Sequence, residues 1–325
     1  MTIEALPSGS YRIREMANGK RYSLTVKKKP SDRVARQLID EQIAKDSGAT
    51  PLMSFRIAAM KYIGVKDNVL SPSTIRGYNS MIRNIPEDFL NLDIGEIKTY
   101  DVQKLVNDYI ADHSAKSTYN LHGFVVAVLG LFLPDLHIHT TLPQKPRTEP
   151  YTPSVDDVKA LLSEAHDTEY YVPLYLATLS CRCSEICALT LDDLDGDQLT
   201  INKALVRADK GYILKPAPKT DASNRSITIP HELAERIREQ GYVYKNYPQQ
   251  IDKYLRRTLP KLGIPFFSLH KLRHFFASYA HDLGYSDATI QSIGGWSTDS
   301  VMKRVYRHAM NGDDARKQIS EDFKF

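Results

Sequence analysis

Four residues in the second half of the chain have the types and spacing to act on a phosphate group. Arg182 lies in Leu-Ser-Cys-Arg-Cys-Ser-Glu, and Lys219 lies in Pro-Lys-Thr at a predicted turn between two strands. His270 and Arg273 lie in His-Lys-Leu-Arg-His, a spacing that places both on one helix face. A guanidinium group is planar and permanently charged, so two arginines can hold the oxygens of a phosphate in bidentate fashion.

Two aromatic residues complete this set. Trp296 follows Ile-Gly-Gly, and Tyr306 stands ten residues beyond it in Arg-Val-Tyr-Arg-His. The chain has 19 tyrosines, and Tyr279 and Tyr285 also lie nearby, but neither follows the Gly-Gly-Trp turn. Each motif alone is weak evidence for a function, because an Arg-x-Ser-Glu or a His-x-x-Arg arises often by chance. The elements together and in this order are specific.

In order and spacing the set resembles the tyrosine recombinases, and within them the integrases of phages and mobile elements. The resemblance covers residues 150–310 and extends more loosely upstream. It implies that Tyr306 attacks a DNA phosphodiester and forms a 3′-phosphotyrosyl bond, whose energy is kept for religation. Arg182 and Arg273 then hold the non-bridging oxygens, and no metal, ATP or other cofactor is implied.

The resemblance also implies roles for the remaining residues. His270 assists as acid or base, and Lys219 protonates the departing 5′-oxygen. Trp296 stands where many members carry a histidine, and its indole N–H can donate a hydrogen bond but cannot exchange a proton. Glu185 and Asp193 match acidic positions expected to orient the arginines, and His308 is expected to be structural.

One position departs from the family pattern. Ser180 stands where the turn before the first arginine usually carries glycine, in a Thr-Gly-Leu-Arg pattern. Serine fits there if the position does not require a positive φ.

Two other functions compete with an integrase. A resolvase-type recombinase shares the chemistry, but simpler recombinases generally begin at the helical DNA-binding domain and lack an N-terminal module. A catalytically silent DNA-binding member is the second alternative. The intact set from Arg182 to Tyr306 argues against it.

The chemistry needs a domain that positions it, and we expect an α+β catalytic domain with a C-terminal tail over residues 154–325. Ser154 and Asp157 form a capping box at its first helix. Gly241 and Gly284 are placed as helix C-caps. Strands are expected at 199–201, 212–214 and 226–229, and helices near 170–180, 184–190, 231–240, 248–262, 270–283, 286–293 and 298–308.

Upstream, four prolines within residues 141–153 predict a linker. Residues 51–140 show a period near 3.6 in four segments, 54–63, 73–84, 99–112 and 117–132, with Thr99 and Ser117 as N-caps. This segment resembles the SAM-like core-binding domain of integrases.

Residues 1–48 are expected to form a β-β-β-α module that resembles an arm-type DNA-binding domain. Tyr11 to Arg14 and Arg21 to Lys29 alternate as strands around an Asn18-Gly19 turn, and a helix follows from Pro30-Ser31-Asp32. The whole fold is thus multidomain, mainly α with small β-sheets.

Positive charge is concentrated in this N-terminal module. Residues 1–50 hold ten Lys or Arg against six Asp or Glu, which accounts for the whole net charge of +4. For the Lys27–Lys29 triplet, phosphate contact and a solvated strand end are equally good interpretations. The expected DNA-contacting residues are Arg12, Arg14, Lys20, Arg21, Lys27, Lys28, Lys29 and Arg76.

The composition argues against a membrane protein, a secreted protein and a metal-binding protein. The longest apolar run, near Phe124 to Leu133, is about half of a membrane span, and no secretory leader opens the sequence. These features argue against a membrane partner or secretion, and the resemblance to phage integrases implies the cytoplasm of a bacterial host. Cys181, Cys183 and Cys187 have a C-x-C-x3-C spacing, but the first two point apart on a helix, so buried reduced thiols are favoured over a metal site.

The expected partner is double-stranded DNA at core and arm sites. By resemblance, two domains encircle the core site, and four protomers assemble as a tetramer on two duplexes. The tail from Asn311 to Phe325 is the candidate segment for docking onto a neighbouring subunit. An accessory directionality or DNA-bending protein is left open, as are the target sequence and the direction of recombination.

Overall fold

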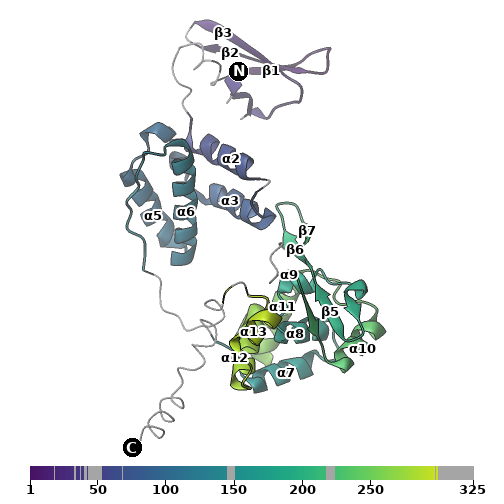
Figure 1. Cartoon of the computed structure of the whole chain (residues 1–325). Helices are drawn as coiled ribbons and strands as arrows, with labels where there is room; N and C mark the ends of the chain where they lie inside the picture. The colour runs from purple at the N-terminus through teal and green to yellow at the C-terminus, as the bar shows by residue number, and fades with distance from the viewer. Residues whose placement is uncertain are drawn as a thin grey trace, which may run out of the picture. The chain divides into compact units, whose positions relative to one another are not determined.

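A computed structural model gives the fold of the chain (Figure 1). Two compact units divide it, Met1–Pro146 and Arg147–Phe325, and the division falls inside the proline-rich segment. The structure describes residues 1–17, 19–32, 34–36, 38–39, 42, 53–67, 69–144, 151–216, 224–296 and 298.

The first unit opens with a small antiparallel sheet in the order β1-β2-β3, formed by β1 (Thr2–Ala5), β2 (Tyr11–Ala17) and β3 (Lys20–Val26). The described residues between 32 and 42 are helical, and Ala35 and Ile39 bury Ile13 of the sheet. Gly19 has a φ of +74°, as the predicted hairpin turn requires. The β-β-β-α module is therefore confirmed.

The prediction for the end of β3 is wrong. The strand ends at Val26, which pairs with Tyr11, the first residue of β2. The Lys27–Lys29 triplet lies beyond this last pair and has no strand beside it in the described part of the sheet.

A helical domain follows within the same unit. Its helices pack around Phe55, Phe124 and Val128, which are almost completely buried. The four predicted helical segments are confirmed, and a short helix and a 3-10 turn join the second to the third. The elements are α2 (Phe55–Lys66), α3 (Pro72–Asn84), α4 (Glu87–Leu90), η1 (Ile94–Glu96), α5 (Thr99–Asp112) and α6 (Ala115–Phe132).

Two predicted caps of this domain are wrong by one and three residues. Thr99 is the first helical residue of α5, since the backbone N–H of Lys98 donates to the carboxylate of Asp101 at 2.9 Å. Ser117 lies inside α6, because Ser114 accepts the hydrogen bond from its backbone N–H at 3.2 Å. In both cases a polar side chain accepts from a free backbone N–H at the helix start, and the cap therefore lies before the predicted residue.

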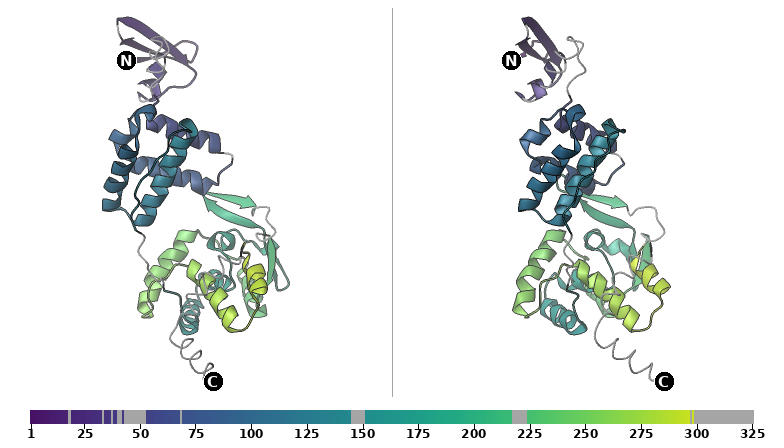
Figure 2. Two further views of the ribbon diagram at one scale, coloured as in Figure 1. Left: turned by 60° about the vertical axis from the view of Figure 1, so that its left-hand side comes forward. Right: turned by 90° about the vertical axis from the view of Figure 1, so that its left-hand side faces the viewer.

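The second unit is the predicted α+β domain (Figure 2). One sheet has the order β4-β5-β8, and β6 and β7 form a separate hairpin that extends from the helices. Its strands are β4 (Leu194–Asp195), β5 (Gln198–Ile201), β6 (Lys203–Arg207), β7 (Tyr212–Pro216) and β8 (Arg225–Thr228). Its helices are α7 (Val155–Ala165), α8 (Tyr171–Thr178), α9 (Cys183–Ile186), α10 (His231–Gln240), α11 (Pro248–Lys261), α12 (His270–Asp282) and α13 (Asp287–Gly294).

Most boundaries predicted for this unit are confirmed. Ser154 and Asp157 form the capping box of α7, with bonds of 2.7 and 3.1 Å, and Gly241 and Gly284 have φ values of +75° and +83°. The helix expected near 184–190 ends at Ile186, because residues 190–193 form the separate 3-10 turn η2 (Leu191–Asp193) with its own capping box. The helix expected at 298–308 lies outside the described residues.

The described helices include none that is long and apolar enough to cross a membrane. Cys181 is buried and lies before α9 rather than on it, so the helical angle assumed for Cys181 and Cys183 does not apply. Cys183 and Cys187 are partly exposed free thiols. No cluster of His, Cys, Asp and Glu suited to a metal ion occurs among the residues that the structure describes.

Candidate active site

Arg182 is held at the junction between α8 and α9, as the sequence predicts. It is the N-cap of α9, and its backbone N–H donates to Glu185 at 2.8 Å. Its guanidinium group donates to the same carboxylate and, at 2.7 Å, to the carbonyl oxygen of Gly295. The side chain is still 36% exposed, so it is fixed on two sides while remaining accessible to a ligand.

Arg273 lies deeper, on the first turns of α12, and is 2% exposed. Its Nη1 donates to the backbone oxygen of Ser180 and lies 3.1 Å from the Ser180 hydroxyl. Its guanidinium carbon lies 4.0 Å from the centre of the Trp296 ring, a cation–π contact. The buried Nη2 has no hydrogen-bond partner among the described residues, so its donors are not used by this part of the chain.

Burial, followed by the charge of Arg182, lowers the pKa of Arg273 to about 9. This value is above neutral pH, and an arginine in a protein keeps its proton in any case. Arg273 therefore carries its positive charge in a place where water screens it poorly.

Arg225, the first residue of β8, is a site residue that was not predicted from the sequence. Its side chain is 6% exposed and pairs with Glu185 at 2.9 Å, and its Nε donates to the carbonyl oxygen of Ile293 at 2.9 Å. The strand pattern could have indicated that Arg225 faces the core, because residues 225 and 227 share a face and Ile227 is apolar. An arginine on a core-facing position needs an internal partner.

Glu185 joins these arginines. It is 5% exposed, and burial alone would raise its pKa, but hydrogen bonds and charge from Arg225 and Arg182 outweigh burial and lower it. Three guanidinium groups interact with this single carboxylate, Arg273 through its charge, so the cluster has a net charge of +2. Such a buried excess of positive charge favours binding of an anion.

His270 begins α12 and lies on the exposed side of the cluster. Desolvation, with the charges of Arg273, Arg182 and Lys271, lowers its pKa below the usual histidine value. The ring is therefore neutral at pH 7 and can accept a proton. His274 stacks edge-to-face on it at 5.0 Å and is more strongly affected, since burial lowers its pKa to about 4.

Trp296 packs into the site as expected and is 8% exposed. Its ring lies directly on Gly294, where an added Cβ would come within 1.8 Å of a ring carbon. Glycine is therefore required at this position for the indole to reach Arg273. The ring also stacks on Phe276 of α12, with 6.4 Å between ring centres.

Ser180 has a positive φ, although serine was expected to fit this turn only if no positive φ is required. Its φ is +73°, and it is the one non-glycine residue with positive φ in the described part of the chain. Serine is nevertheless accommodated, fully buried, at the end of α8.

Asp193 contacts no arginine among the described residues, contrary to the expectation. Its carboxylate accepts from Lys203 at 2.8 Å and from the backbone and hydroxyl of Thr190 at 2.7 and 3.0 Å. It therefore stabilises the start of η2 and anchors β6. The reason is local, since Asp193 is the third residue of a capped turn and its side chain folds back on the cap.

Lys219, Tyr306 and His308 lie outside the described residues, as does the tail from Asn311 to Phe325. Their roles stay predictions. The described strands β7 and β8 lead into and out of the segment that contains Lys219.

Three of the predicted DNA-contacting residues share one face of the N-terminal sheet. Arg12 and Arg14 alternate with buried Ile13, and Arg21 pairs with Met16, which lies on the same face as these two arginines. Lys20 pairs with Ala17 and belongs to the opposite face, so the predicted set does not form one surface. Arg14 contacts Glu4 at 3.2 Å in an exposed pair, and Arg76 is part of α3 in the helical domain.

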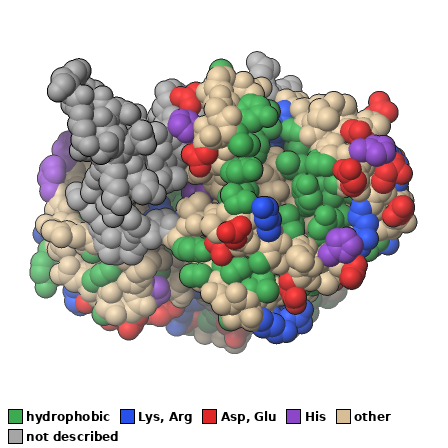
Figure 3. Space-filling model, turned by 90° about the horizontal axis from the view of Figure 1, so that it is seen from below, with side chains coloured by type: hydrophobic (Ala, Val, Ile, Leu, Met, Phe, Trp, Pro, Cys, Tyr) green, Lys and Arg blue, Asp and Glu red, His purple; other side chains and the backbone are tan. Residues whose placement is uncertain are grey.

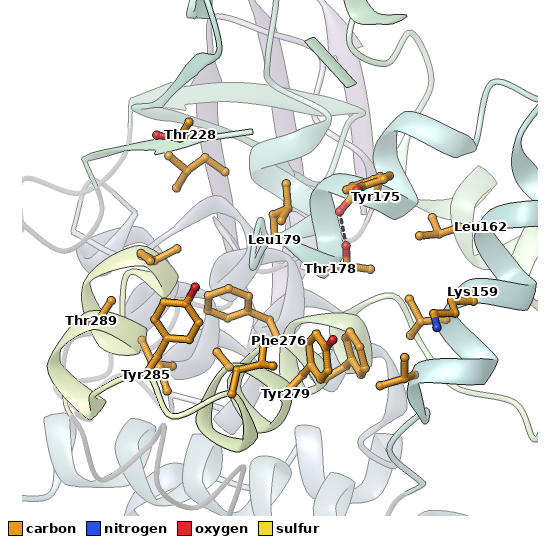
Figure 4. Close-up of a pocket in the computed structure, with 18 residues that line it drawn as sticks. Lys159, Leu162, Tyr175, Thr178, Leu179, Thr228, Phe276, Tyr279, Tyr285 and Thr289 are labelled. Carbon is orange, nitrogen blue, oxygen red and sulfur yellow. Dashed lines mark hydrogen bonds between the residues drawn. The ribbon is translucent and has the colours of Figure 1, made fainter. Parts of the chain in front are cut away.

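An apolar groove of about 420 Å³ opens beside the arginine cluster, between α7, α8, α12, α13 and β8. The aromatic side chains of Phe276, Tyr279 and Tyr285 line it (Figure 4). On the face drawn in Figure 3, hydrophobic side chains gather with a few charged ones among them. Tyr279 and Tyr285, the alternatives to Tyr306 considered above, both belong to this groove.

Known proteins share both the sequence pattern and the fold. The model of the phage integrase family matches residues 154–312, and that of the phage integrase N-terminal SAM-like domain matches residues 55–110. The tyrosine recombinase XerA of Thermococcus kodakarensis is 28% identical over 279 residues, which are 77% of this chain and 92% of that protein. The transposase of transposon Tn916 from Enterococcus faecalis is 24% identical over 46% of this chain and 44% of its own length.

Two solved structures show the same fold. The Tn1549 transposon integrase in complex with circular intermediate DNA has a TM-score of 0.68 and 20% identity, and the match covers 83% of this chain and 99% of that one. A lambda integrase tetramer bound to a Holliday junction has a TM-score of 0.60 and 17% identity, covering 96% of each chain.

The fold is thus the one found in integrases solved with DNA, and the chain is a member of the phage integrase family of tyrosine recombinases. It is accordingly an enzyme of site-specific DNA recombination.

Proposed function

We propose that this recombinase integrates or excises a phage or other mobile element, cutting and rejoining DNA through a 3′-phosphotyrosyl bond to Tyr306. The observation that supports this most directly is the Arg182–Arg225–Arg273 cluster around Glu185. It holds excess positive charge at low exposure, with the Nη2 of Arg273 unpartnered among the described residues. A scissile phosphate is an anion whose charge increases during attack, which is what such a cluster stabilises.

The proton transfers follow from the charges of the site. The Tyr306 hydroxyl must lose a proton as its oxygen attacks phosphorus, and neutral His270 can accept it directly or through water. The 5′-oxygen leaves as the bond breaks, and Lys219 gives it a proton. Religation runs the same steps in reverse, so the bond energy stays in the phosphotyrosine and no ATP is consumed. The guanidinium groups already supply the positive charge that a divalent ion would otherwise bring to the phosphate.

The two units are proposed to bind different DNA sites. The second unit carries the chemistry on the core site, and the N-terminal sheet presents Arg12, Arg14 and Arg21 to an arm site. The Lys27–Lys29 triplet remains a candidate for phosphate contact. Because the reaction acts on the chromosome and an element's DNA, we place it in the cytoplasm of a bacterial host.

The active complex is proposed to be a tetramer on two duplexes, in line with the lambda integrase tetramer on a Holliday junction. The apolar groove beside α12 and α13 gives the tail of a neighbouring subunit a place to dock. Deleting residues 312–325 should weaken assembly on DNA, as seen by native gel or mass photometry. Full recombination by the truncated protein would refute this part of the proposal.

An integrase fits better than a resolvase-type enzyme. The match to the lambda integrase structure covers 96% of the chain. The uncovered 4% is smaller than the N-terminal module of 48 residues, so the match includes part of this module. The XerA relative matches 77% of the chain. An accessory directionality or DNA-bending protein remains compatible with this function.

Covalent capture tests the proposal. The protein is incubated in EDTA with nicked duplexes that span the element's ends, with Tyr306→Phe as the matched control, and analysed on denaturing gels. We expect a denaturant-resistant protein–DNA adduct from the native protein alone. No adduct on DNA that both proteins bind would favour a DNA-binding role without cleavage, and an adduct with Tyr306→Phe would assign the nucleophile to another tyrosine.

A further inference from the structure

The turn that ends α8 has a residue type that its backbone disfavours. The N–H of Ser180 donates to the oxygen of Ala177, and the N–H of Cys181 donates to the oxygen of Leu176, both at 3.1 Å. This pair of bonds is the Schellman motif, whose left-handed position is usually glycine. Ser180 occupies that position with a φ of +73°.

Serine brings a cost and one new contact to this position. A side chain in the left-handed region is strained against the following carbonyl group, and glycine would avoid the strain. The backbone oxygen that accepts from Arg273 would be present with glycine as well. What serine adds is its hydroxyl, fully buried and 3.1 Å from Nη1 of Arg273.

This hydroxyl completes the fixation of one end of the guanidinium group. Nη1 of Arg273 contacts both oxygens of Ser180, while Trp296 covers the group from one side at 4.0 Å. Arg225 also reaches the Ser180 carbonyl oxygen, at 3.4 Å, so that oxygen is shared between two arginines. The Ser180 hydroxyl then provides Arg273 with an acceptor of its own.

We propose that Ser180 is a positioning residue for Arg273: its hydroxyl fixes Nη1, so that Nη2 is held ready for the non-bridging oxygen of the scissile phosphate. The strain of the left-handed serine is retained because the contact serves catalysis. This inference rests on the proposed function, since the phosphate is the ligand of Nη2.

Two substitutions separate strain from hydrogen bonding. Ser180→Gly removes both the hydroxyl and the strain, whereas Ser180→Ala removes the hydroxyl and keeps the strain. The glycine variant should melt on the order of 2–4 °C above the alanine variant. If the hydroxyl acts through Arg273, both should nevertheless lose the same roughly tenfold or more in the rate of covalent cleavage. Their affinity for the nicked duplex used for capture should stay near that of the native protein.

A matched control is Ser278→Ala, on the same helix as Arg273. Ser278 is also buried, and its hydroxyl has no hydrogen-bond partner among the described residues. We expect the native cleavage rate from this variant. Cleavage at the native rate by Ser180→Gly, or rates for the two Ser180 variants that follow their melting temperatures, would overturn the proposal.

A second measurement does not depend on cleavage. Ser180→Ala, Arg273→Met and the double variant form a thermodynamic cycle in urea unfolding. We expect the two single effects to be non-additive, and strictly additive effects would contradict the contact. If the native protein forms no adduct but the cycle shows coupling, the proposed function fails while the Ser180–Arg273 contact stands.

Discussion

Arginines occur in two regions of this protein under opposite conditions. In the catalytic unit, Arg182, Arg225 and Arg273 converge on Glu185 and the Ser180 turn, with Arg273 2% exposed. On the N-terminal sheet, Arg12, Arg14 and Arg21 stand on an open face, where Arg14 shares an exposed ion pair with Glu4.

The difference shows how position decides what a guanidinium group can do. Hydrogen bonds and ion pairs hold the arginines of the cluster before any DNA arrives, so they can act on a single phosphate with little reorganisation. The exposed arginines remain hydrated and flexible, which suits contacts along a DNA backbone with counterion release. The first region should therefore control rate, and the second should control affinity and its salt dependence.

Arg273 should be the position at which substitution lowers the cleavage rate most. Arg273→Lys keeps a positive charge but cannot contact Ser180 and a phosphate with one planar group, so cleavage should fall about a hundredfold or more. Single-turnover adduct formation on a nicked duplex measures the rate, and a gel shift measures binding, which should change little. A rate within threefold of native would mean that charge alone, without geometry, suffices at this position.

Glu185 tests how far the buried cluster depends on its one carboxylate. Glu185→Gln leaves Arg182 and Arg225 without a charged partner, and we expect the free energy of unfolding to fall by about 3 kcal/mol. Urea unfolding measures this value. The control is Asp252→Asn, which removes an exposed i,i+4 pair with Arg256 and should change stability by less than about 1 kcal/mol. Equal effects would show that the Glu185 cluster behaves like a surface pair.

The exposed face should respond in affinity and not in rate. Replacing Arg12, Arg14 and Arg21 by Gln should weaken arm-site binding and lower the salt slope by roughly 0.9 for each phosphate that is no longer neutralised. Core-site cleavage should stay unchanged. Lys20→Gln, on the opposite face, is the matched control with a smaller slope change. Neutralising Lys27, Lys28 and Lys29 decides whether the triplet belongs to the same surface, and an unchanged slope would assign it to solvent.

The stability of the buried region should also respond to pH. Because the pKa of His274 is lowered to about 4 in the folded protein, unfolding takes up a proton between about pH 4 and the usual histidine value near 6.5. Stability from this group is therefore present above pH 6.5 and lost as the pH falls toward 4. His274→Asn should flatten the dependence of unfolding free energy on pH in this window. His137→Asn, at an exposed position of the first unit, serves as the control, and equal curves for both variants would contradict the assignment.

Local sequence patterns were enough to predict several parts of this protein. The His270–Arg273 spacing, the Ser154–Asp157 capping box and the turn at Gly19 depend on residues within a few positions of one another, so pattern and propensity suffice. The multidomain fold class followed from the same local patterns, taken segment by segment. Two predicted helix caps were wrong because a neighbouring polar side chain accepts from free backbone N–H groups, as Ser114 does for α6.

The contacts of the arginine cluster could not be predicted from local patterns, because they join residues far apart in the chain. Arg225 reaches Glu185 from 40 residues away, Arg273 reaches Ser180 from 93, and Arg182 reaches Gly295 from 113. Asp193, which the family pattern suggested for an arginine, instead holds Thr190 and Lys203. Such pairings depend on which distant segments pack together, and a buried charge takes whichever partner that packing brings within reach. The positive φ of Ser180 has the same origin, because the closing turn of α8 must deliver its carbonyl and hydroxyl to a helix that follows about 90 residues later.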